Sequence, residues 1–494
     1  MKRTMRTNPS LRSITLAMLA AALVSACAVG PAYQRPAAPE PAAFKELQGW
    51  VPAAPADTLE RGPWWTLFDD PQLNELAASV EVSNQNVAAA VAAYAQARAL
   101  VAEQRASLFP SVTLNGSGTR SGTRGGGSGN ATVDANGNII GGGSEGGSVR
   151  NAYRLSLGTS WEPDVWGRLR AGVTAASASA QASAADLAAA RLSAQGELAA
   201  DYLQLRAIDA QRALLATTIE GYQRVLTITR NRYDAGIAPH SDVYQAETQL
   251  ASAQSDDLTQ ARQRAQLEHA IAVLVGKAPA DLSIAPRLQG PAQYTFLVPE
   301  VPVGVPSTLL QRRPDIAGAE RRVAAANEQI GIARSAYFPN IGLSASYGTS
   351  ASKVSELFNA SAAAWSFGLS AAQTLFDAGA TRARVESARA AHEQAVARYR
   401  QTVLTAFADV EDQLSATRVL SQQQELQRRA SEAADKVEQQ VLNRYKAGQV
   451  SYSEVVQAQV TALNARRSLV TTQTTRQTTT VALIQALGGG WHAE

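Results

Sequence analysis

The five residues Arg232-Tyr233-Asp234-Ala235-Gly236 return 212 positions later as Arg444-Tyr445-Lys446-Ala447-Gly448. Other residues match at the same offset, in the same order: Gln245, Ala246 and Gly276 correspond to Gln457, Ala458 and Gly488. So many ordered matches indicate an internal duplication. Glycine readily adopts the left-handed backbone of a tight turn that ends a helix. We therefore expect two helical hairpins, which turn at Gly236 and at Gly448.

Long helical patterns extend from both turns. They cover about 169–229 and 241–275 in the first copy, and about 381–443 and 453–487 in the second. Helices of this length far exceed the usual dozen or so residues, and they are stable only when they pack along one another, as in coiled coils.

Four short segments alternate strictly between apolar and polar residues, which is the period of a β-strand. They lie near 112–114, 153–161, 341–347 and 365–371, and helical patterns at about 71–106 and 315–336 precede them. Each half of the chain is therefore predicted as helix, β-hairpin, long helix, tight turn and long helix.

Two hairpins supply four strands, which are too few to close a barrel, and open sheet edges do not persist in lipid. Three copies of the chain would supply twelve strands, a plausible number for a pore. A soluble four-stranded sheet covered by helices is the alternative. The aromatic side chains of Trp161 and Trp365 favour the barrel, because such rings anchor strands at membrane interfaces.

The N-terminal region has the pattern of an export signal. Basic residues precede an apolar run at 14–24, which is too short to span a bilayer and leads to Cys27, the only cysteine of the 494 residues. Val24-Ser25-Ala26-Cys27 resembles a bacterial lipobox, and the alternative is a plain signal peptide with an incidental cysteine. We expect removal of 1–26, acylation of Cys27, and an extended tether over 27–62, which is rich in proline and alanine.

Several classes of function lack support in the sequence. A formal net charge of +3, spread along the chain, argues against binding to nucleic acid. No catalytic motif is evident, so we expect neither an enzyme nor a cofactor beyond the lipid on Cys27. The four histidines lack the spacing of metal ligands: His240, His269, His392 and His492.

Further motifs make the chain resemble the TolC-type outer-membrane efflux channels, specifically their lipoprotein branch. The motifs span nearly the whole mature chain: Pro31-Ala32-Tyr33-Gln34-Arg35-Pro36, Trp65-Thr66-Leu67-Phe68-Asp69-Asp70-Pro71-Gln72-Leu73, Trp161-Glu162-Pro163-Asp164-Val165-Trp166-Gly167-Arg168, Leu309-Leu310-Gln311-Arg312-Arg313-Pro314-Asp315-Ile316, Tyr337-Phe338-Pro339 and Ala486-Leu487-Gly488-Gly489-Gly490-Trp491. The resemblance implies an α+β membrane protein: a trimeric twelve-stranded β-barrel in the outer membrane, continued by a long α-helical barrel in the periplasm.

The resemblance also implies partners and a task. The chain would assemble as a homotrimer, and its partners would be a periplasmic adaptor protein and an inner-membrane transporter of the resistance-nodulation-division type. Together they would export drugs or other small solutes. We expect the first structural repeat over 63–277, a linker in the equatorial region over 278–305, and the second repeat with a C-terminal equatorial segment over 306–494. The alternative is a periplasmic lipoprotein that acts as a scaffold or adaptor through its long helical hairpins.

The resemblance implies a tube that is closed at rest at its periplasmic tips, and the two turns would lie at this gate. Asp242 and Glu454 begin the returning helices, and a ring of these carboxylates would favour cations and close the aperture by pairing with Arg232 or Arg444. It is equally consistent that the two acids only offset the helix dipole. Related channels commonly have an aspartate at the position of Gln457, so a ring at that level would be weaker here. Tyr445 completes the gate candidates.

Overall fold

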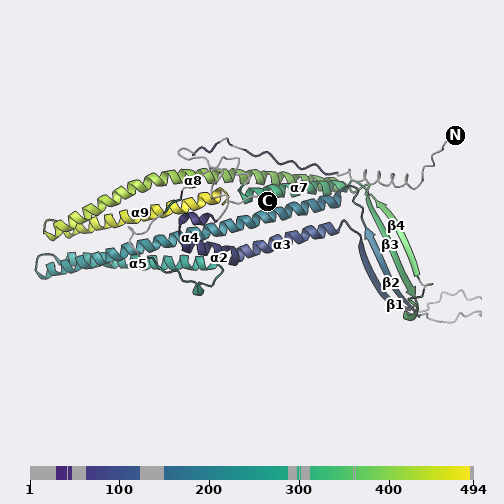
Figure 1. The fold of residues 1–494 in the computed structure, drawn as a ribbon, viewed down its shortest axis with the longest axis horizontal. Helices are drawn as coiled ribbons and strands as arrows, with labels where there is room; N and C mark the ends of the chain where they lie inside the picture. The colour runs from purple at the N-terminus through teal and green to yellow at the C-terminus, as the bar shows by residue number, and fades with distance from the viewer. Residues whose placement is uncertain are drawn as a thin grey trace, which may run out of the picture. The chain divides into compact units, whose positions relative to one another are not determined.

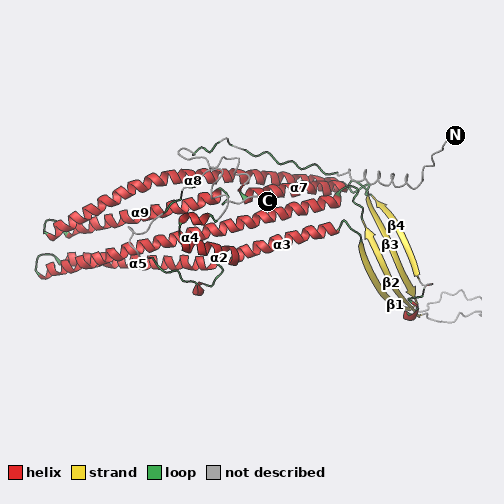
Figure 2. Ribbon diagram, viewed as in Figure 1, coloured by secondary structure: helices red, strands yellow, loops and turns green. Residues whose placement is uncertain are grey.

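The structure is a computed structural model that describes residues 29–39, 41, 43–46, 63–122, 149–287, 297–299, 301, 312–359, 361 and 363–489. The chain divides into two compact units, each assembled from separate stretches of sequence. The first contains Ala99–Ser177 and Ala324–His392, and the second contains Arg35–Arg98, Ala178–Val323 and Glu393–Glu494. Figure 1 follows the chain through both, and all the strands of the described residues, drawn yellow in Figure 2, belong to the first.

The first unit contains a four-stranded antiparallel sheet with its strands in sequence order. The strands are β1 (Ser111–Gly122), β2 (Val149–Trp161), β3 (Asn340–Ala351) and β4 (Ala363–Ala372). The two predicted hairpins, β1–β2 and β3–β4, are confirmed. Pairing of β2 with β3 joins them into a single sheet.

Strand register separates the sheet into an apolar face and a face rich in hydroxyl groups. Leu157 lies opposite Leu114 on one side and Tyr347 on the other, and Tyr347 in turn lies opposite Trp365. The alternate positions carry mainly small polar residues, among them Ser111, Thr113, Asn115, Ser117, Ser156, Ser160, Ser344, Ser346, Ser366 and Ser370. Because side chains alternate between the two faces of a strand, the period-two pattern produces this division directly.

Helices make up most of the remaining described chain. The α-helices are α2 (Pro71–Ser83), α3 (Gln85–Ala106), α4 (Arg168–Asp234), α5 (His240–Leu274), α7 (Pro314–Ser335), α8 (Ala380–Lys446) and α9 (Tyr452–Ala486). Short 3-10 helices are η2 (Trp64–Phe68), η3 (Pro279–Asp281) and η4 (Val354–Glu356). No helix in the described ranges has an apolar run of the length that a bilayer crossing requires.

The segment 71–106, expected as a single helical run, is interrupted at Asn84. This buried residue has an extended backbone, with φ −66° and ψ 125°. Its side-chain oxygen accepts hydrogen bonds from the backbone N–H groups of Asn86 and Val87, and its amide nitrogen donates to the Leu274 carbonyl at 2.7 Å. Asn84 therefore caps α3 while it holds the end of α5, a competing use of the side chain that apolar spacing does not reveal.

The bounds of the elements confirm the internal duplication. Helices α4 and α8 have 67 residues each, and α5 and α9 have 35 each, with both pairs displaced by 212 positions. Helices α3 and α7 correspond at a displacement of 229, as do β1 and β3. The two halves thus share one plan and differ in length within the first β-hairpin.

Equivalent glycines perform the same task in each copy. Gly276 has φ +70°, and a Cβ there would lie 2.1 Å from the Ser83 carbonyl oxygen. Gly488 has φ +94°, and a Cβ there would lie 2.3 Å from the Arg312 carbonyl oxygen. Ser83 and Arg312 are themselves separated by 229 positions, so the duplication preserves a close backbone contact.

A buried polar network joins α4 to α5 in the second unit, called the helical unit below. The Asp209 carboxylate accepts hydrogen bonds from Arg206 at 2.8 Å, Arg264 at 2.7 Å and the backbone N–H of Arg287 at 3.1 Å. Arg206 and Asp209 have no exposed side-chain surface. Removal of one member would leave a buried charge unpaired, which typically costs about 3–5 kcal/mol.

Candidate functional site

The two helical hairpins end in turns of the same construction, both in the helical unit. The Gly236 N–H donates to the Tyr233 carbonyl at 2.8 Å, and the Ile237 N–H donates to the Arg232 carbonyl at 2.8 Å. Gly236 has φ +71°. These bonds define a Schellman motif, which satisfies carbonyl groups at the end of α4 and requires the left-handed residue that glycine supplies.

The second turn repeats this geometry at the end of α8. The Gly448 N–H donates to the Tyr445 carbonyl at 2.9 Å, and the Gln449 N–H donates to the Arg444 carbonyl at 2.9 Å. Gly448 has φ +74°. The backbone of the duplicated motif is therefore the same in both hairpins, as the sequence predicted.

An apolar cluster joins the two hairpins just inside their turns. Tyr445 and Tyr452 are buried, and their rings lie 5.6 Å apart between centroids. Helices α4, α5, α8 and α9 all contribute to the cluster, whose buried members are Val225, Leu226, Val243, Ala246, Tyr445, Tyr452 and Val455. Two hairpins packed in this way move apart only by exposing apolar surface, which resists opening.

Arg232 adds a directional contact between the hairpins. Its guanidinium donates to the Tyr445 carbonyl oxygen at 2.8 Å, and its central carbon lies 4.6 Å from the centroid of the Tyr445 ring. The Tyr445 hydroxyl lies 3.3 Å from the hydroxyl of buried Thr229. Two of the predicted gate residues, Arg232 and Tyr445, therefore meet within one subunit.

The second arginine of the duplicated motif behaves differently. Arg444 is exposed, and among the described residues no ion pair joins it to Asp242 or Glu454. Arg232 likewise bonds to a carbonyl group and not to either acid. Pairing between acid and arginine within one subunit, one form of the predicted closure, is thus not present in the described chain.

The acids at the starts of the returning helices have distinct surroundings. Glu454 is exposed, and its carboxylate accepts a hydrogen bond from the Ser451 N–H at 3.4 Å, as part of a capping box at the start of α9. Asp242 is half-buried in the first turn of α5. Burial, together with the charges of Tyr445, Tyr222 and Asp242, raises the pKa of Tyr452.

Gln457 lies one turn further along α9 and is exposed. Asp242, Glu454 and Gln457 therefore remain predictions as gate residues, and capping is an observed structural role for Glu454. Cys27 lies outside the described residues, as do His492 and most of the stretch between 288 and 311. The described residues contain no cluster of metal-ligating side chains.

Sequence reasoning missed several residues at the turns. Tyr452 and Thr229 are buried against Tyr445. On the first hairpin, the His240 ring lies 4.5 Å from that of Tyr233 and 4.3 Å from that of Tyr244, between centroids. The displacement of 212 positions aligns His240 with Tyr452, and this aromatic correspondence could have indicated a shared role.

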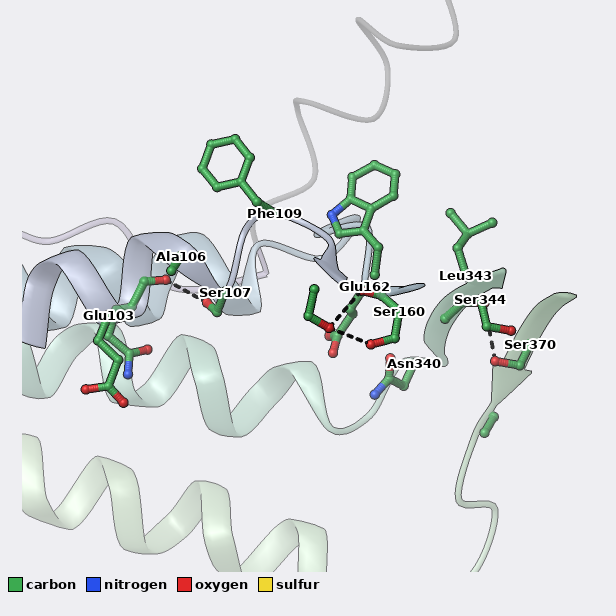
Figure 3. A pocket seen from close by; sticks show the side chains of 15 residues that line it. Glu103, Ala106, Ser107, Phe109, Ser160, Glu162, Asn340, Leu343, Ser344 and Ser370 are labelled. Atoms are coloured by element: carbon green, nitrogen blue, oxygen red, sulfur yellow. Dashed lines mark hydrogen bonds between the residues drawn. The ribbon is translucent and has the colours of Figure 1, made fainter. Parts of the chain in front are cut away.

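The hydroxyl-rich face of the sheet is the second region of interest. Near the starts of β1 and β3 and the ends of β2 and β4, this face borders an open hollow of about 770 Å³. Its lining includes Ser160, Ser344 and Ser370 from three strands, and Figure 3 shows Leu343 and Ser344 directed to opposite sides. The Ser111 and Ser160 hydroxyl groups lie 2.8 Å apart. Such a surface can be wetted.

Comparison with known proteins identifies the class to which this geometry belongs. The family model of the outer membrane efflux protein matches residues 76–277 and 305–489. The chain belongs to this family. It is also 31% identical over 487 residues to the toluene efflux pump outer membrane protein TtgC of Pseudomonas putida, with 98% of this chain and 96% of TtgC covered.

Other members agree in sequence and in fold. The cation efflux system protein CusC of Escherichia coli is 29% identical over 468 residues, covering 95% of this chain and 96% of CusC. The solved structure of the outer-membrane channel OprN superimposes with a TM-score of 0.81 at 29% identity, covering 94% of this chain and 100% of that one. The chain thus has the fold of a TolC-like channel subunit: four strands of a trimeric twelve-stranded barrel and a long helical barrel. It is the outer-membrane component of an efflux system, and not a periplasmic adaptor.

Proposed function

We propose that this chain is the outer-membrane exit duct of a tripartite pump, which passes drugs or other small solutes from an inner-membrane transporter to the exterior. Its function is conduction and gating, without catalysis, metal or resident cofactor. The observation that supports this most strongly is the sheet with one apolar and one hydroxyl-rich face, combined with two long hairpins whose helices match in length and whose turns match in backbone. A closed barrel places the apolar face against lipid and the polar face around water.

The proposed partners are two further copies of the chain, a periplasmic adaptor and an inner-membrane transporter of the resistance-nodulation-division type. An adaptor that separates the hairpins would shift an equilibrium between closed and open states. We further propose that acylated Cys27 anchors the mature chain in the outer membrane. The names of the relatives mention cargoes as different as toluene and cations, which supports a duct whose partner transporter selects the cargo.

Export in cells tests this proposal. In a strain that lacks its own outer-membrane channel but keeps an adaptor and a pump of the resistance-nodulation-division type, expression of the chain should restore efflux of a fluorescent dye. Expression of the adaptor and pump alone is the control and should leave dye accumulation high. Equal accumulation with and without the chain would contradict the proposed function.

Lipid anchoring is tested separately with Cys27→Ser. Metabolic labelling with a palmitate analogue should label the wild-type chain and leave Cys27→Ser unlabelled. Labelling of both, or of neither, would contradict acylation at Cys27 and leave the channel function unaffected.

A further inference from the structure

The charges of the sheet are all of one sign. Among their described residues, the four strands contain three arginines, Arg120 in β1 and Arg150 and Arg154 in β2, and no acidic residue. All three arginines are exposed. They lie in the halves of β1 and β2 remote from Ser111 and Trp161, where the strands begin and end next to helical segments.

Strand register places two of these arginines on the hydroxyl-rich face. Arg154 lies opposite Ser117 of β1 and opposite Ser350 of β3, and Arg150 lies opposite Ser121. Arg120 lies on the opposite, apolar face of the sheet. It lies opposite Asn151, two residues from Gly118, which lies opposite Tyr153 on the apolar face.

The neighbours of Arg154 on its own face are small and uncharged. They include Ser156, and Ser156 lies opposite Asn115 and Gly348. Within the described chain, no carboxylate forms an ion pair with Arg150 or Arg154. Their guanidinium groups therefore keep their charge exposed above a surface of hydroxyl groups.

The far end of the same face differs in charge. The hollow near Ser111 and Ser160 includes two carboxylates, those of Glu103 and Glu162. Glu162 is neutralised by Arg168, with 2.8 Å between carboxylate oxygen and guanidinium nitrogen. Arg154 lies seven residues from Trp161 along β2, or roughly 23 Å at the usual rise of a strand. The polar face thus becomes more positive away from the helices.

We propose that Arg150 and Arg154 form an anion-attracting ring inside the channel, near the end of the barrel that is remote from the helices. This inference rests on the proposed function, because only a closed trimer brings the polar faces of three sheets around one lumen. Three subunits contribute six guanidinium groups, and a ring of arginines raises the local concentration of anions and opposes cations. Anionic organic solutes and inorganic anions are the class of cargo that such a ring favours.

The test measures ion selectivity of the purified trimer in planar bilayers under a potassium chloride gradient. The variant Arg150→Gln with Arg154→Gln should raise the ratio of potassium to chloride permeability by about twofold or more, because the ring that attracts chloride is lost. Arg120→Gln is the matched control: it removes one positive charge from the same half of the sheet but on the apolar face, so it should leave the ratio unchanged.

Salt and side-chain chemistry provide further readouts. The shift should shrink when the salt rises from about 0.1 M to about 1 M, because the screening length falls from about 10 Å to about 3 Å. Arg154→Lys should keep the wild-type ratio, and Arg154→Gln alone should give part of the shift of the double variant. If the double variant assembles poorly into trimers, the permeability ratios of the two Arg154 variants still test the proposal.

The possible failures are distinguishable. If wild-type trimers conduct and the double variant has the same permeability ratio, the arginine ring is overturned and the channel function stands. An equal shift from Arg120→Gln would also overturn it, because the face would then be irrelevant. Wild-type protein that passes no current would overturn the proposed function, and this inference with it.

Discussion

The guanidinium of Arg232 lies over the ring of Tyr445 and donates to the Tyr445 carbonyl oxygen at 2.8 Å. The Arg232 carbonyl in turn accepts hydrogen bonds from Ile237 and Ala238 in its own turn. One residue thus organises the first turn and holds the second hairpin. Its duplicate, Arg444, is exposed. The duplication is symmetrical in backbone and asymmetrical in side-chain contacts, so the two hairpins are not equivalent within one subunit.

Arg232→Ala should loosen the contact between the hairpins. Loss of a charge-assisted hydrogen bond and of a cation–π contact typically costs about 2 kcal/mol. A closed state that depends on this contact should therefore open more often, and the mean conductance of the purified trimer should rise. Single-channel recording measures this directly.

Arg230→Ala is the matched control for that variant. Arg230 lies two residues earlier on α4, is largely exposed, and pairs with Glu247 on α5 of the same hairpin at 2.6 Å. Its removal should leave conductance unchanged, because it does not join the two hairpins. Equal conductance of Arg232→Ala, Arg230→Ala and wild type would exclude Arg232 from closure.

Glu454 has two possible tasks, and two substitutions separate them. Glutamine retains the capping box but removes the charge, whereas alanine removes both. If a carboxylate ring restricts the aperture, Glu454→Gln with Asp242→Asn should raise conductance and reduce selectivity for cations. If Glu454 only caps α9, the glutamine variant should match wild type, and Glu454→Ala should lose about 1 kcal/mol of stability.

Gly276 and Gly488 should tolerate no side chain. Alanine at either position meets a carbonyl oxygen and adopts an unfavourable positive φ, so each substitution should cost at least the 1–3 kcal/mol or so of such backbone strain. Gly221 is the control, because it lies within α4 and a Cβ there would meet no heavy atom within 4 Å. Gly221→Ala should gain roughly 0.5–1 kcal/mol from helix propensity. Unfolding of the trimer by heat or denaturant compares the three, and equal effects would contradict the contact.

Asp201 should make stability depend on pH. Burial and the nearby carboxylate of Glu197 raise its pKa from 3.8 to about 6 in the folded chain. Between these values the folded state binds more protons than the unfolded state, so stability falls as pH rises from about 4 to about 6. Asp201→Asn removes this loss of stability. The unfolding temperature of the variant minus that of wild type should therefore be greater at pH 7 than at pH 4, by on the order of 2 °C.

Glu197→Gln serves as a companion to the Asp201 variant. It removes the repelling charge but leaves Asp201 buried, so its gain at pH 7 should be smaller than that of Asp201→Asn. A difference between Asp201→Asn and wild type that stays the same at both pH values would show that Asp201 titrates normally.

Much of the fold could be predicted from sequence because the patterns are long and repeated. The motif ending in Gly236 and Gly448 placed both turns correctly, and alternation near Leu157 and Tyr347 located strands that pair in the sheet. Periodicity of this kind is a property of the backbone and its environment, and so it is visible in a single sequence.

The contacts at the gate could not be predicted in the same way. Equivalent residues in the two motifs differ in their surroundings: Arg232 bonds to Tyr445 on the other hairpin, whereas Arg444 is exposed. Asn84 likewise ends a helical run through a tertiary bond to Leu274, which no local pattern reveals. Side-chain partners depend on the arrangement of distant segments, and spacing along the chain does not fix them.

Single-channel recording of purified wild-type protein in planar bilayers tests whether three subunits share one pore. The unheated trimer should produce discrete conductance steps. The monomer obtained by heating that trimer should produce none, because one sheet of four strands cannot enclose a lumen. Discrete steps from the monomer, or a trimer that never conducts, would contradict a pore shared by three subunits.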